Sequence, residues 1–317
     1  MRCIQNVRRL YELPSKMIKK TFFQLPAELT DPKTARFHVL PIPYEGTVCF
    51  MHGTAAGPDA ILDVSDQMEY IDEELRNEFC KAGIATYAPI PSYPTPAEQS
   101  QCIYNAVRPL FQPDFQSPTP NPQPPFPIFL GGEHSITPPI VRAAAEVYPN
   151  LSVLQFDAHA DLRDEFTGGK FSHASAMRRV LEITPYLTQV GVRSYSAEEL
   201  QECPEQIDSL ITVPMLETEA GLRKAIETIL DRLTDTVYIT FDIDAFDPAI
   251  APATGTPDPG GMTWRQATTI LREVSQAKNV VGADVVETAP FQNGNIITEF
   301  LAARLVAKIM AYNTPEG

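Results

Sequence analysis

Short apolar runs alternate with amphipathic segments along most of this chain. The runs are rich in β-branched and aromatic residues, which is typical of strands buried on both faces of a parallel sheet. They predict strands at residues 37–41, 128–130, 151–156, 187–192, 237–241 and 280–286. Helices are predicted at Trp264–Ala277 and at 222–233 and 298–312, and a further helix is predicted to begin at Gly57. This alternation predicts an α/β fold with helices on both faces of a mostly parallel sheet.

Local signals support two of these helices. In the helix that begins at Gly57, the spacing of Ile61, Val64 and Met68 predicts that all three face the core. Thr263 precedes another predicted helix and is followed three residues later by Gln266, a spacing typical of a capping box.

Composition and charge narrow the class of protein. With 317 residues, 44% of them hydrophobic, the chain can form one large α/β domain, which we expect at residues 21–317. It has no apolar stretch of roughly 20 residues, so no membrane span is expected. A formal net charge of −15 argues against a nucleic-acid partner. The acidity suits a cationic substrate, although solubility explains it equally well.

Two segments are expected to lie outside the core. Residues 1–20 are basic but lack the apolar centre of a secretory signal, so they are interpreted as a disordered arm or a start-site artefact. Seven prolines between residues 113 and 127 predict a stiff surface loop, with a polyproline partner-binding segment as the alternative. The five cysteines are odd in number and lack C-x-x-C spacing, which indicates reduced thiols and a cytoplasmic location.

Carboxylates and histidines follow several of the predicted strands. Asp157, His159 and Asp161 follow one strand at alternate positions, and Asp242 and Asp244 follow another. If these segments stay extended, alternate side chains point the same way and converge at the carboxyl edge of the sheet. Buried carboxylates need an opposite charge or a metal ion. The sequence therefore predicts a metal site at this edge.

The number and type of donors indicate which metal is bound. Two divalent cations would balance the four aspartates, and His134 and His159 would supply neutral nitrogen atoms. A donor set rich in carboxylates and free of thiols favours Mn²⁺, with Ni²⁺ or Co²⁺ as alternatives. Paired cations can generate a hydroxide nucleophile at neutral pH. Taken alone, the D-x-H-x-D pattern is also typical of a polar turn, and His173 of a structural histidine.

Four motifs in one order resemble the ureohydrolase family of arginases and agmatinases, which release urea from guanidino compounds. They are residues 131–135, 157–161, 241–248 and 255–261, and weaker similarity extends from about residue 41 to the C-terminal helix. The resemblance implies a three-layer α/β/α sandwich around a parallel sheet, assembled as a homotrimer or homohexamer. It also implies a small cationic guanidino substrate.

The resemblance further implies a role for each matching residue. The implied ligands of one Mn²⁺ are His134, Asp157, Asp161 and Asp242, and those of the second are Asp157, His159, Asp242 and Asp244. Asp161 would orient the attacking hydroxide and carry a proton to the leaving amine. Glu287 would pair with the guanidinium group, and His173 would shuttle protons.

The loop after Asp161 bears on the substrate. Arginases carry small polar residues there, whereas this chain has Leu162, Arg163, Asp164 and Glu165, which looks more like the agmatinase branch. The expected reaction is hydrolysis of agmatine to putrescine and urea. If Arg163 bound a substrate carboxylate instead of pairing with Asp164 or Glu165, guanidinobutyrate or guanidinopropionate would fit. Guanidine and arginine remain candidate substrates, and a one-zinc deacetylase of related fold and a non-catalytic scaffold remain candidate classes of protein.

Overall fold

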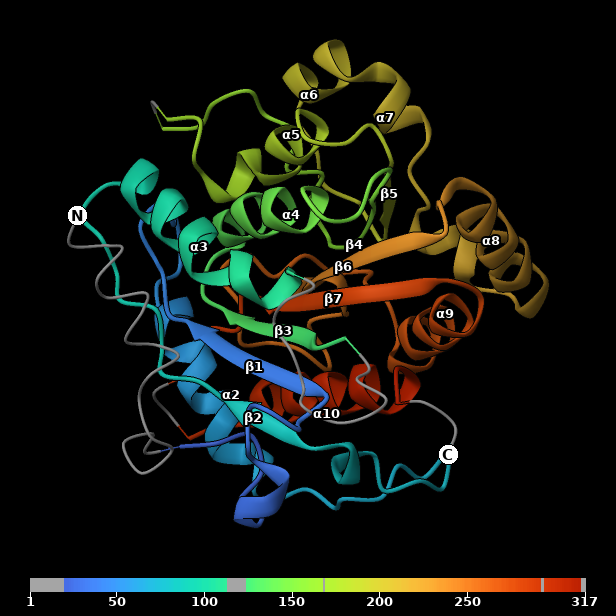
Figure 1. The fold of residues 1–317 in the computed structure, drawn as a ribbon. Helices are drawn as coiled ribbons and strands as arrows, with labels where there is room; N and C mark the ends of the chain where they lie inside the picture. The colour runs from blue at the N-terminus through green and yellow to red at the C-terminus, as the bar shows by residue number, and fades with distance from the viewer. Residues whose placement is uncertain (1–19, 113–123, 168, 292–293, 315–317) are drawn as a thin grey trace.

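One parallel sheet forms the centre of the protein in this computed structural model, which describes residues 20–112, 124–167, 169–291 and 294–314. Seven strands lie in the order β2-β1-β3-β7-β6-β4-β5, and every pair is parallel (Figure 1). They are β1 Phe37–Ile42, β2 Ile84–Thr86, β3 Phe126–Gly131, β4 Ser152–Phe156, β5 Leu187–Val190, β6 Thr236–Asp242 and β7 Asn279–Val286.

Helices cover both faces of the sheet, which confirms the predicted three-layer α/β/α fold. Helices α3, α4 and α5 lie on one face, and α2, α8, α9 and α10 pack against the other (Figure 1). The bounds are α2 Gly57–Ser65, α3 Pro96–Phe111, α4 Thr137–Ala145, α5 Ala176–Leu181, α6 Ala197–Glu202, α7 Pro204–Asp208, α8 Glu219–Arg232, α9 Trp264–Ala277 and α10 Ile297–Tyr312.

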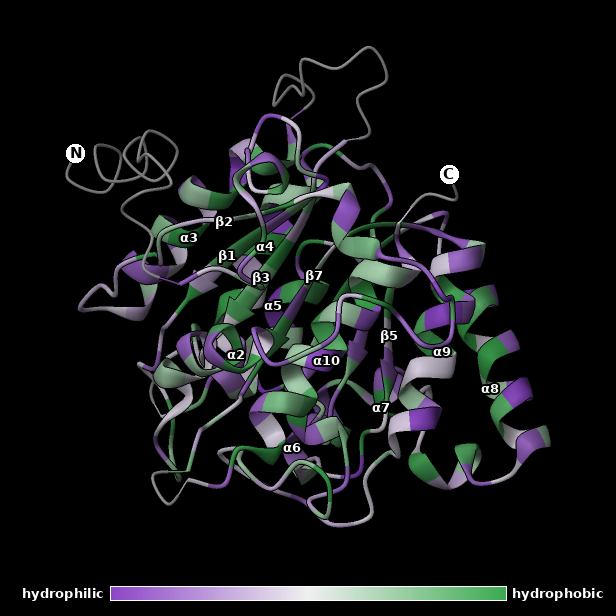
Figure 2. Ribbon diagram, turned by 90° about the horizontal axis from the view of Figure 1, so that it is seen from below, coloured by the Kyte–Doolittle hydropathy of each residue, from purple (hydrophilic) through white to green (hydrophobic). Residues whose placement is uncertain are grey.

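Alternate strand residues contribute to different hydrophobic clusters on the two faces of the sheet. In β1, Phe37 and Val39 belong to the cluster that includes α2 and α10, whereas Leu40 and Ile42 belong to the cluster that includes α3 and α4. This is the two-residue period of a strand buried on both faces. Figure 2 shows hydrophobic residues in green along the central strands and mixed green and purple on α8.

The predicted elements are confirmed with small changes at their ends. Helix α9 has the predicted bounds and the predicted capping box. Ile61 and Val64 are buried, but α2 ends at Ser65, so Met68 lies beyond the helix and is only partly buried. Strand β5 ends at Val190, two residues earlier than predicted. Strand β2 and helices α3 to α7 were not predicted.

Two of the predicted segments fall largely outside the described residues. They are the basic arm, of which only Lys20 is described, and most of the proline-rich segment. The single domain at residues 21–317 stays a prediction.

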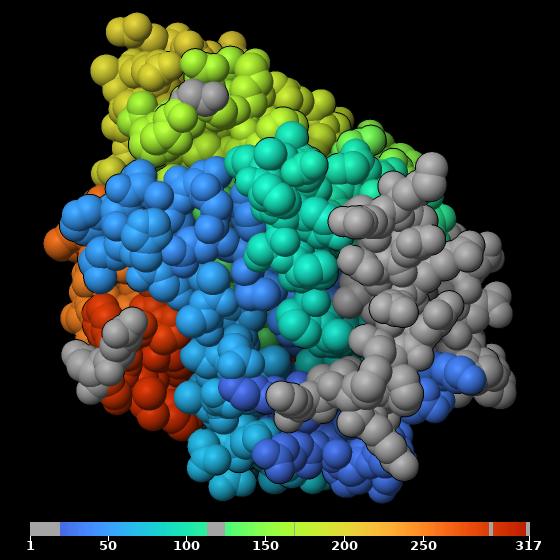
Figure 3. Space-filling model, turned by 90° about the vertical axis from the view of Figure 1, so that its left-hand side faces the viewer, coloured from blue at the N-terminus to red at the C-terminus, as the bar shows by residue number. Residues whose placement is uncertain are grey.

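Within the described ranges, no helix is long and apolar enough to cross a bilayer. Figure 3 shows the segment after β1 (blue) beside the α3 region (teal) and the yellow-green residues that follow β4.

Ion pairs around a buried lysine join α10 to the segment that follows α2. Lys308 has a side chain that is only 2% exposed, and its Nζ lies 2.8 Å from Asp72, 3.1 Å from Glu73 and 3.2 Å from Glu74. Asp72 is equally buried and also accepts the backbone N–H groups of Glu74 and Leu75. Lys308 therefore neutralises a carboxylate that has little access to water.

Replacing Lys308 by methionine should lower the free energy of unfolding by about 3–5 kcal/mol, because Asp72 would stay buried without its counter-ion. The matched control is Arg304→Met on the same helix. Arg304 pairs with the exposed Glu73, so its loss should cost no more than about 1 kcal/mol. Urea unfolding followed by circular dichroism measures both, and equal losses would contradict the role assigned to Lys308.

Candidate metal centre

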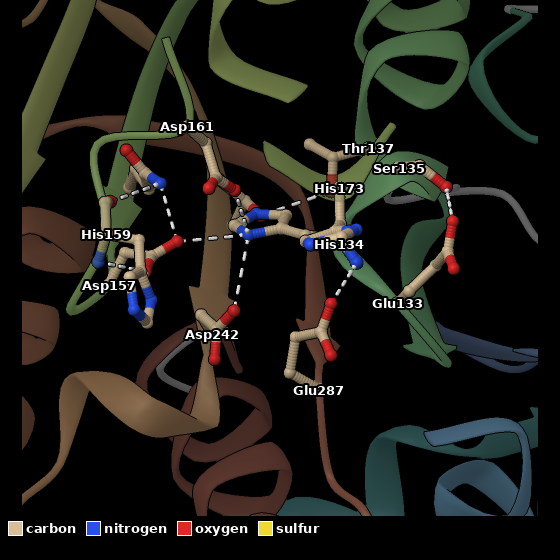
Figure 4. A network of polar contacts seen from close by, with 12 residues as sticks. Glu133, His134, Ser135, Thr137, Asp157, His159, Asp161, His173, Asp242 and Glu287 are labelled. Atoms are coloured by element: carbon tan, nitrogen blue, oxygen red, sulfur yellow. Dashed lines mark hydrogen bonds and ion pairs between the residues drawn. The ribbon is translucent and has the colours of Figure 1, made fainter. Parts of the chain in front are cut away.

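Four adjacent strands direct polar side chains to one edge of the sheet. His134 begins the short 3-10 helix that follows β3, Asp157 follows β4, Asp242 ends β6, and Glu287 follows β7. These strands are neighbours in the order β3-β7-β6-β4, so their carboxyl ends meet. Figure 4 shows the four side chains pointing towards a common centre. Ligands bind outside the carboxyl ends of strands in open α/β sheets.

The first cluster is centred on the imidazole of His134. Its Nδ1 lies 3.0 Å from Asp157 Oδ2, 3.2 Å from Asp161 Oδ2 and 3.4 Å from Asp242 Oδ2 (Figure 4). All four residues are buried. His134, Asp157 and Asp242 form a group whose donor atoms lie within 4.8 Å of one another, close enough to hold one metal ion.

A second cluster lies beside the first and shares Asp157 with it. His159 Nδ1 is 3.0 Å from Asp244 Oδ2 and 3.6 Å from Asp157 Oδ1. These three residues also bring donor atoms within 4.8 Å of one another. Two buried His/Asp clusters that share a carboxylate are the donor arrangement of a binuclear metal site.

A hydrogen-bond count shows that the first cluster suits a cation. Thr240 Oγ1 donates its one hydrogen to Asp284 Oδ1 at 2.6 Å. It must therefore accept from His134 Nε2–H, at 2.9 Å. In the neutral imidazole this leaves a lone pair on Nδ1, facing three carboxylate oxygens, and this buried atom has no hydrogen-bond partner within the described residues. A cation among these acceptors would satisfy all of them.

The charge balance supports the same conclusion. Burial, followed by the carboxylates of Asp244 and Asp157, raises the pKa of Asp242 well above its usual value. If all four aspartates, Asp157, Asp161, Asp242 and Asp244, were ionised, two negative charges would stay uncompensated in a buried site even with both imidazoles protonated. Divalent cations remove this excess, so the residues present fit a binuclear metal site.

The route by which the ligands converge differs from the prediction. Strand β4 ends at Phe156, so the alternation of an extended chain does not continue through the next residues. The chain turns instead, and Asp161 adopts a positive φ of 54°. The turn is held by bonds from the N–H of His159 to Asp157 Oδ1 and from the N–H of Ala158 to Asp244 Oδ1. The predicted residues do meet, but the extended-strand explanation was wrong for this segment.

Glu287 lies directly beside the first cluster. Its Oε1 accepts the backbone N–H of His134 at 2.6 Å, and the residue has a φ of 64°. A non-glycine residue with positive φ is uncommon, and such conformations gather at functional sites. Glu287 lines a cavity of about 250 Å³ together with His134, His159 and His173. The structure thus brings all the predicted site residues into one region.

Arg163 also lines this cavity, but its partner differs from the prediction. Its guanidinium lies 5.3 Å from the ring centre of Phe166 and 3.5 Å from Glu198 Oε2. Of the two predicted partners, Asp164 and Glu165, the first pairs instead with Arg179, at 2.6 Å. The carboxylate beside Arg163 therefore comes from α6, a helix that the sequence did not predict.

Three residues that support the histidines were missed in the sequence. Asp284 and Thr240 hold His134, and Thr47 Oγ1 lies 3.1 Å from His173 Nδ1. Asp284 could have been recognised from the sequence, because a carboxylate inside an apolar strand needs buried hydrogen-bond partners. Thr47 follows β1, far from His173 in the chain, and its sequence context carries no comparable signal.

The chain matches known proteins over most of its length. The family described as the Arginase family matches residues 35–312. An N(1)-aminopropylagmatine ureohydrolase of Synechocystis sp. is 36% identical, with 86% of this chain and 88% of the relative covered. An agmatinase of Bacillus subtilis is 31% identical, covering 85% and 89%. The crystal structure of an agmatine ureohydrolase of Thermoplasma volcanium is 29% identical, with a TM-score of 0.80 over 96% of this chain and 97% of that one.

These matches, together with the buried clusters, identify the class of protein. The chain belongs to the arginase family. It is a ureohydrolase, an enzyme that hydrolyses linear amidines, of the agmatinase branch.

The hydrogen bond from His134 to Thr240 should support metal affinity. Thr240→Val removes the acceptor for Nε2–H, and the loss of such an outer partner typically costs 10–100-fold in metal affinity. We expect Mn²⁺ to bind about 10–100-fold more weakly to this variant, as measured by isothermal titration calorimetry. Thr240→Ser keeps the hydroxyl and should bind as the wild type does. Equal affinity in all three proteins would contradict this role.

Proposed function

We propose that this chain hydrolyses the guanidino group of agmatine, giving putrescine and urea, with two Mn²⁺ ions per subunit. The observation that carries the proposal is the pair of buried His/Asp clusters that share Asp157, with the carboxylate of Glu287 beside them. A homotrimer or homohexamer stays a prediction from the resemblance, and a cytoplasmic location stays a prediction from the cysteines.

The clusters suggest which residues would hold each ion. The proposed ligands are His134, Asp157, Asp161 and Asp242 for one ion, and Asp157, His159, Asp242 and Asp244 for the other. Carboxylate oxygens and imidazoles without thiols suit Mn²⁺, with Ni²⁺ or Co²⁺ as alternatives. When bound, the pair of ions supplies Lewis acidity and activates water at neutral pH.

Three side chains would bind the substrate and transfer protons. Glu287 would bind the guanidinium group, because a carboxylate matches the planar donor fork of that group. One of its oxygens accepts from His134 N–H, which leaves the other for the substrate. Asp161 would orient the water and pass its proton to the departing amine. His173, on the wall of the same cavity, would exchange the other proton of the attacking water with solvent.

The chemical group at the far end of the substrate, opposite the guanidino group, is proposed from the residues that line the cavity and from the named relatives. Arg163 pairs with Glu198, which reduces its availability to a substrate carboxylate and favours an amine over a guanidino acid. N1-aminopropylagmatine, which would give spermidine and urea, is the second candidate. It is favoured by the higher identity to the Synechocystis relative, 36%, than to the Bacillus subtilis agmatinase, 31%.

A substrate panel tests the proposal directly. Protein loaded with Mn²⁺ should release urea from agmatine or N1-aminopropylagmatine at least about 100-fold more efficiently than from arginine, guanidinobutyrate, guanidinopropionate or guanidine. A site built to hydrogen-bond one group of its substrate rejects compounds that lack the group by more than this factor. The ratio of kcat/KM for the first two substrates decides between the candidates. Asp157→Asn, which alters the shared ligand, should lose metal and turnover together.

Two results of the panel would overturn the proposal. Urea release from none of these compounds under Mn²⁺, Ni²⁺ or Co²⁺ would remove the catalytic interpretation and favour a scaffold. Release of acetate from acetylated amines with one zinc per chain would favour a deacetylase.

Glu287→Gln should separate substrate binding from metal binding. Glutamine keeps an oxygen for the N–H of His134 but removes the charge that would face the guanidinium. We expect kcat/KM to fall by about 100-fold, which corresponds to about 2.7 kcal/mol of transition-state stabilisation. Elemental analysis should find unchanged metal content. Loss of metal from this variant would assign Glu287 a structural role instead.

A further inference from the structure

We propose that Thr47 is a positioning residue that sets the tautomer of His173, so that the lone pair of His173 Nε2 faces the cavity. The inference concerns a residue that neither the motifs nor the metal clusters include. Its catalytic consequence rests on the proposed role of His173 as a proton shuttle.

A series of hydrogen bonds runs from Glu133 through Thr47 to His173, and Glu133 is its first acceptor. The side chain is fully buried, and its Oε2 accepts the backbone N–H groups of Gly46 at 2.8 Å and Thr47 at 2.7 Å. Its Oε1 accepts the hydroxyls of Thr47, at 2.7 Å, and Ser135. A carboxylate with four donors around it is an acceptor only. Figure 4 shows Glu133 next to Ser135, with both to the right of the metal ligands.

The hydroxyl of Thr47 therefore has only acceptor capacity left. Its single hydrogen is directed to Glu133, and a hydroxyl oxygen has two lone pairs. Two groups of His173 lie within reach of them, the backbone N–H at 3.1 Å and the ring Nδ1 at 3.1 Å. The second contact is a hydrogen bond only if Nδ1 carries a proton. The neutral imidazole is then the Nδ1–H tautomer, and Nε2 is its basic atom.

Contacts on the other sides of the ring agree with this assignment. Nε2 lies 3.8 Å from Cys49 Sγ, a weak donor that also lines the cavity. The ring of Phe166 meets the imidazole nearly edge-on, with centroids 5.6 Å apart and planes at 83°. Thr47 and Phe166 belong to the segments after β1 and β4 that adjoin in Figure 3. The ring is thus held in place, with its basic nitrogen directed away from Thr47.

The first test reads the tautomer without any substrate. In protein labelled with ¹³C,¹⁵N-histidine and carrying Mg²⁺ in place of paramagnetic Mn²⁺, ring chemical shifts report the protonated nitrogen, and His173→Asn assigns the signal. We expect Nδ1–H in the wild type and in Thr47→Ser, and a mixture with Nε2–H in Thr47→Val. An Nε2–H ring in the wild type, or a ring unchanged in Thr47→Val, would overturn the assignment.

The second test asks whether Thr47 acts through His173. With the guanidino compound that the enzyme prefers, Thr47→Val should lower kcat by about tenfold and change KM by less than about twofold. This loss is part of the 10²–10⁴-fold that a proton-transfer group typically contributes. The pH profile of kcat should shift, and Thr47→Ser should restore both. In the His173→Asn background, Thr47→Val should cost nothing further, because the residues act as one unit.

Separate outcomes distinguish this inference from the proposed function. Additive losses in the double variant would show that Thr47 acts independently of His173 and would refute the positioning role. If the wild type hydrolyses none of the guanidino compounds, the proposed function fails. The tautomer measurement still decides how Thr47 holds the ring. Thermal unfolding of Thr47→Ser and Thr47→Val identifies any loss of kcat that comes from misfolding.

Discussion

Repulsion among buried carboxylates is the constraint on which the rest of the structure depends. Asp157, Asp161, Asp242 and Asp244 occupy neighbouring positions at one edge of the sheet, where water cannot screen them. The parallel topology places them there, because they follow β4 and β6, two adjacent strands that end at the same edge. Their charge makes the edge a site for cations and for a cationic substrate. The same crowding would destabilise the fold if these side chains had no partner of opposite charge.

Threonine hydroxyls connect this charged centre to the surrounding protein. Asp284, Thr240 and His134 form one series of hydrogen bonds, and Glu133 and Thr47 lead to His173 in another. In both, a carboxylate oxygen takes the hydroxyl hydrogen, so the hydroxyl must accept from the ring. A carboxylate placed directly against the imidazole would add another negative charge near the site. An intervening threonine sets the tautomer and keeps that charge farther away.

Much of this could be predicted from the sequence, for physical reasons. Period-two and period-3.6 patterns report which faces are buried, so strands such as β6 and helices such as α9 were located within a residue or two. Asp157 and Asp242 were placed correctly because parallel strands end at a common edge. The turn at Asp161 was not predictable, because its positive φ depends on tertiary hydrogen bonds. Thr47 was missed for a similar reason, since pairing between distant loops leaves no local pattern.

The metal clusters also bear on how the chain folds. Their donors come from the ends of β3, β4 and β6. Strands β3 and β4 are consecutive in the chain but not neighbours in the sheet, whereas β4 and β6 are neighbours in the sheet but not consecutive in the chain. The first cluster cannot form until β7 lies between β3 and β6, whereas the second needs only the pairing of β4 with β6. Ions that bind the folded chain more tightly than the unfolded one therefore stabilise the whole sheet by mass action. A cell short of the metal would lose folded protein as well as activity.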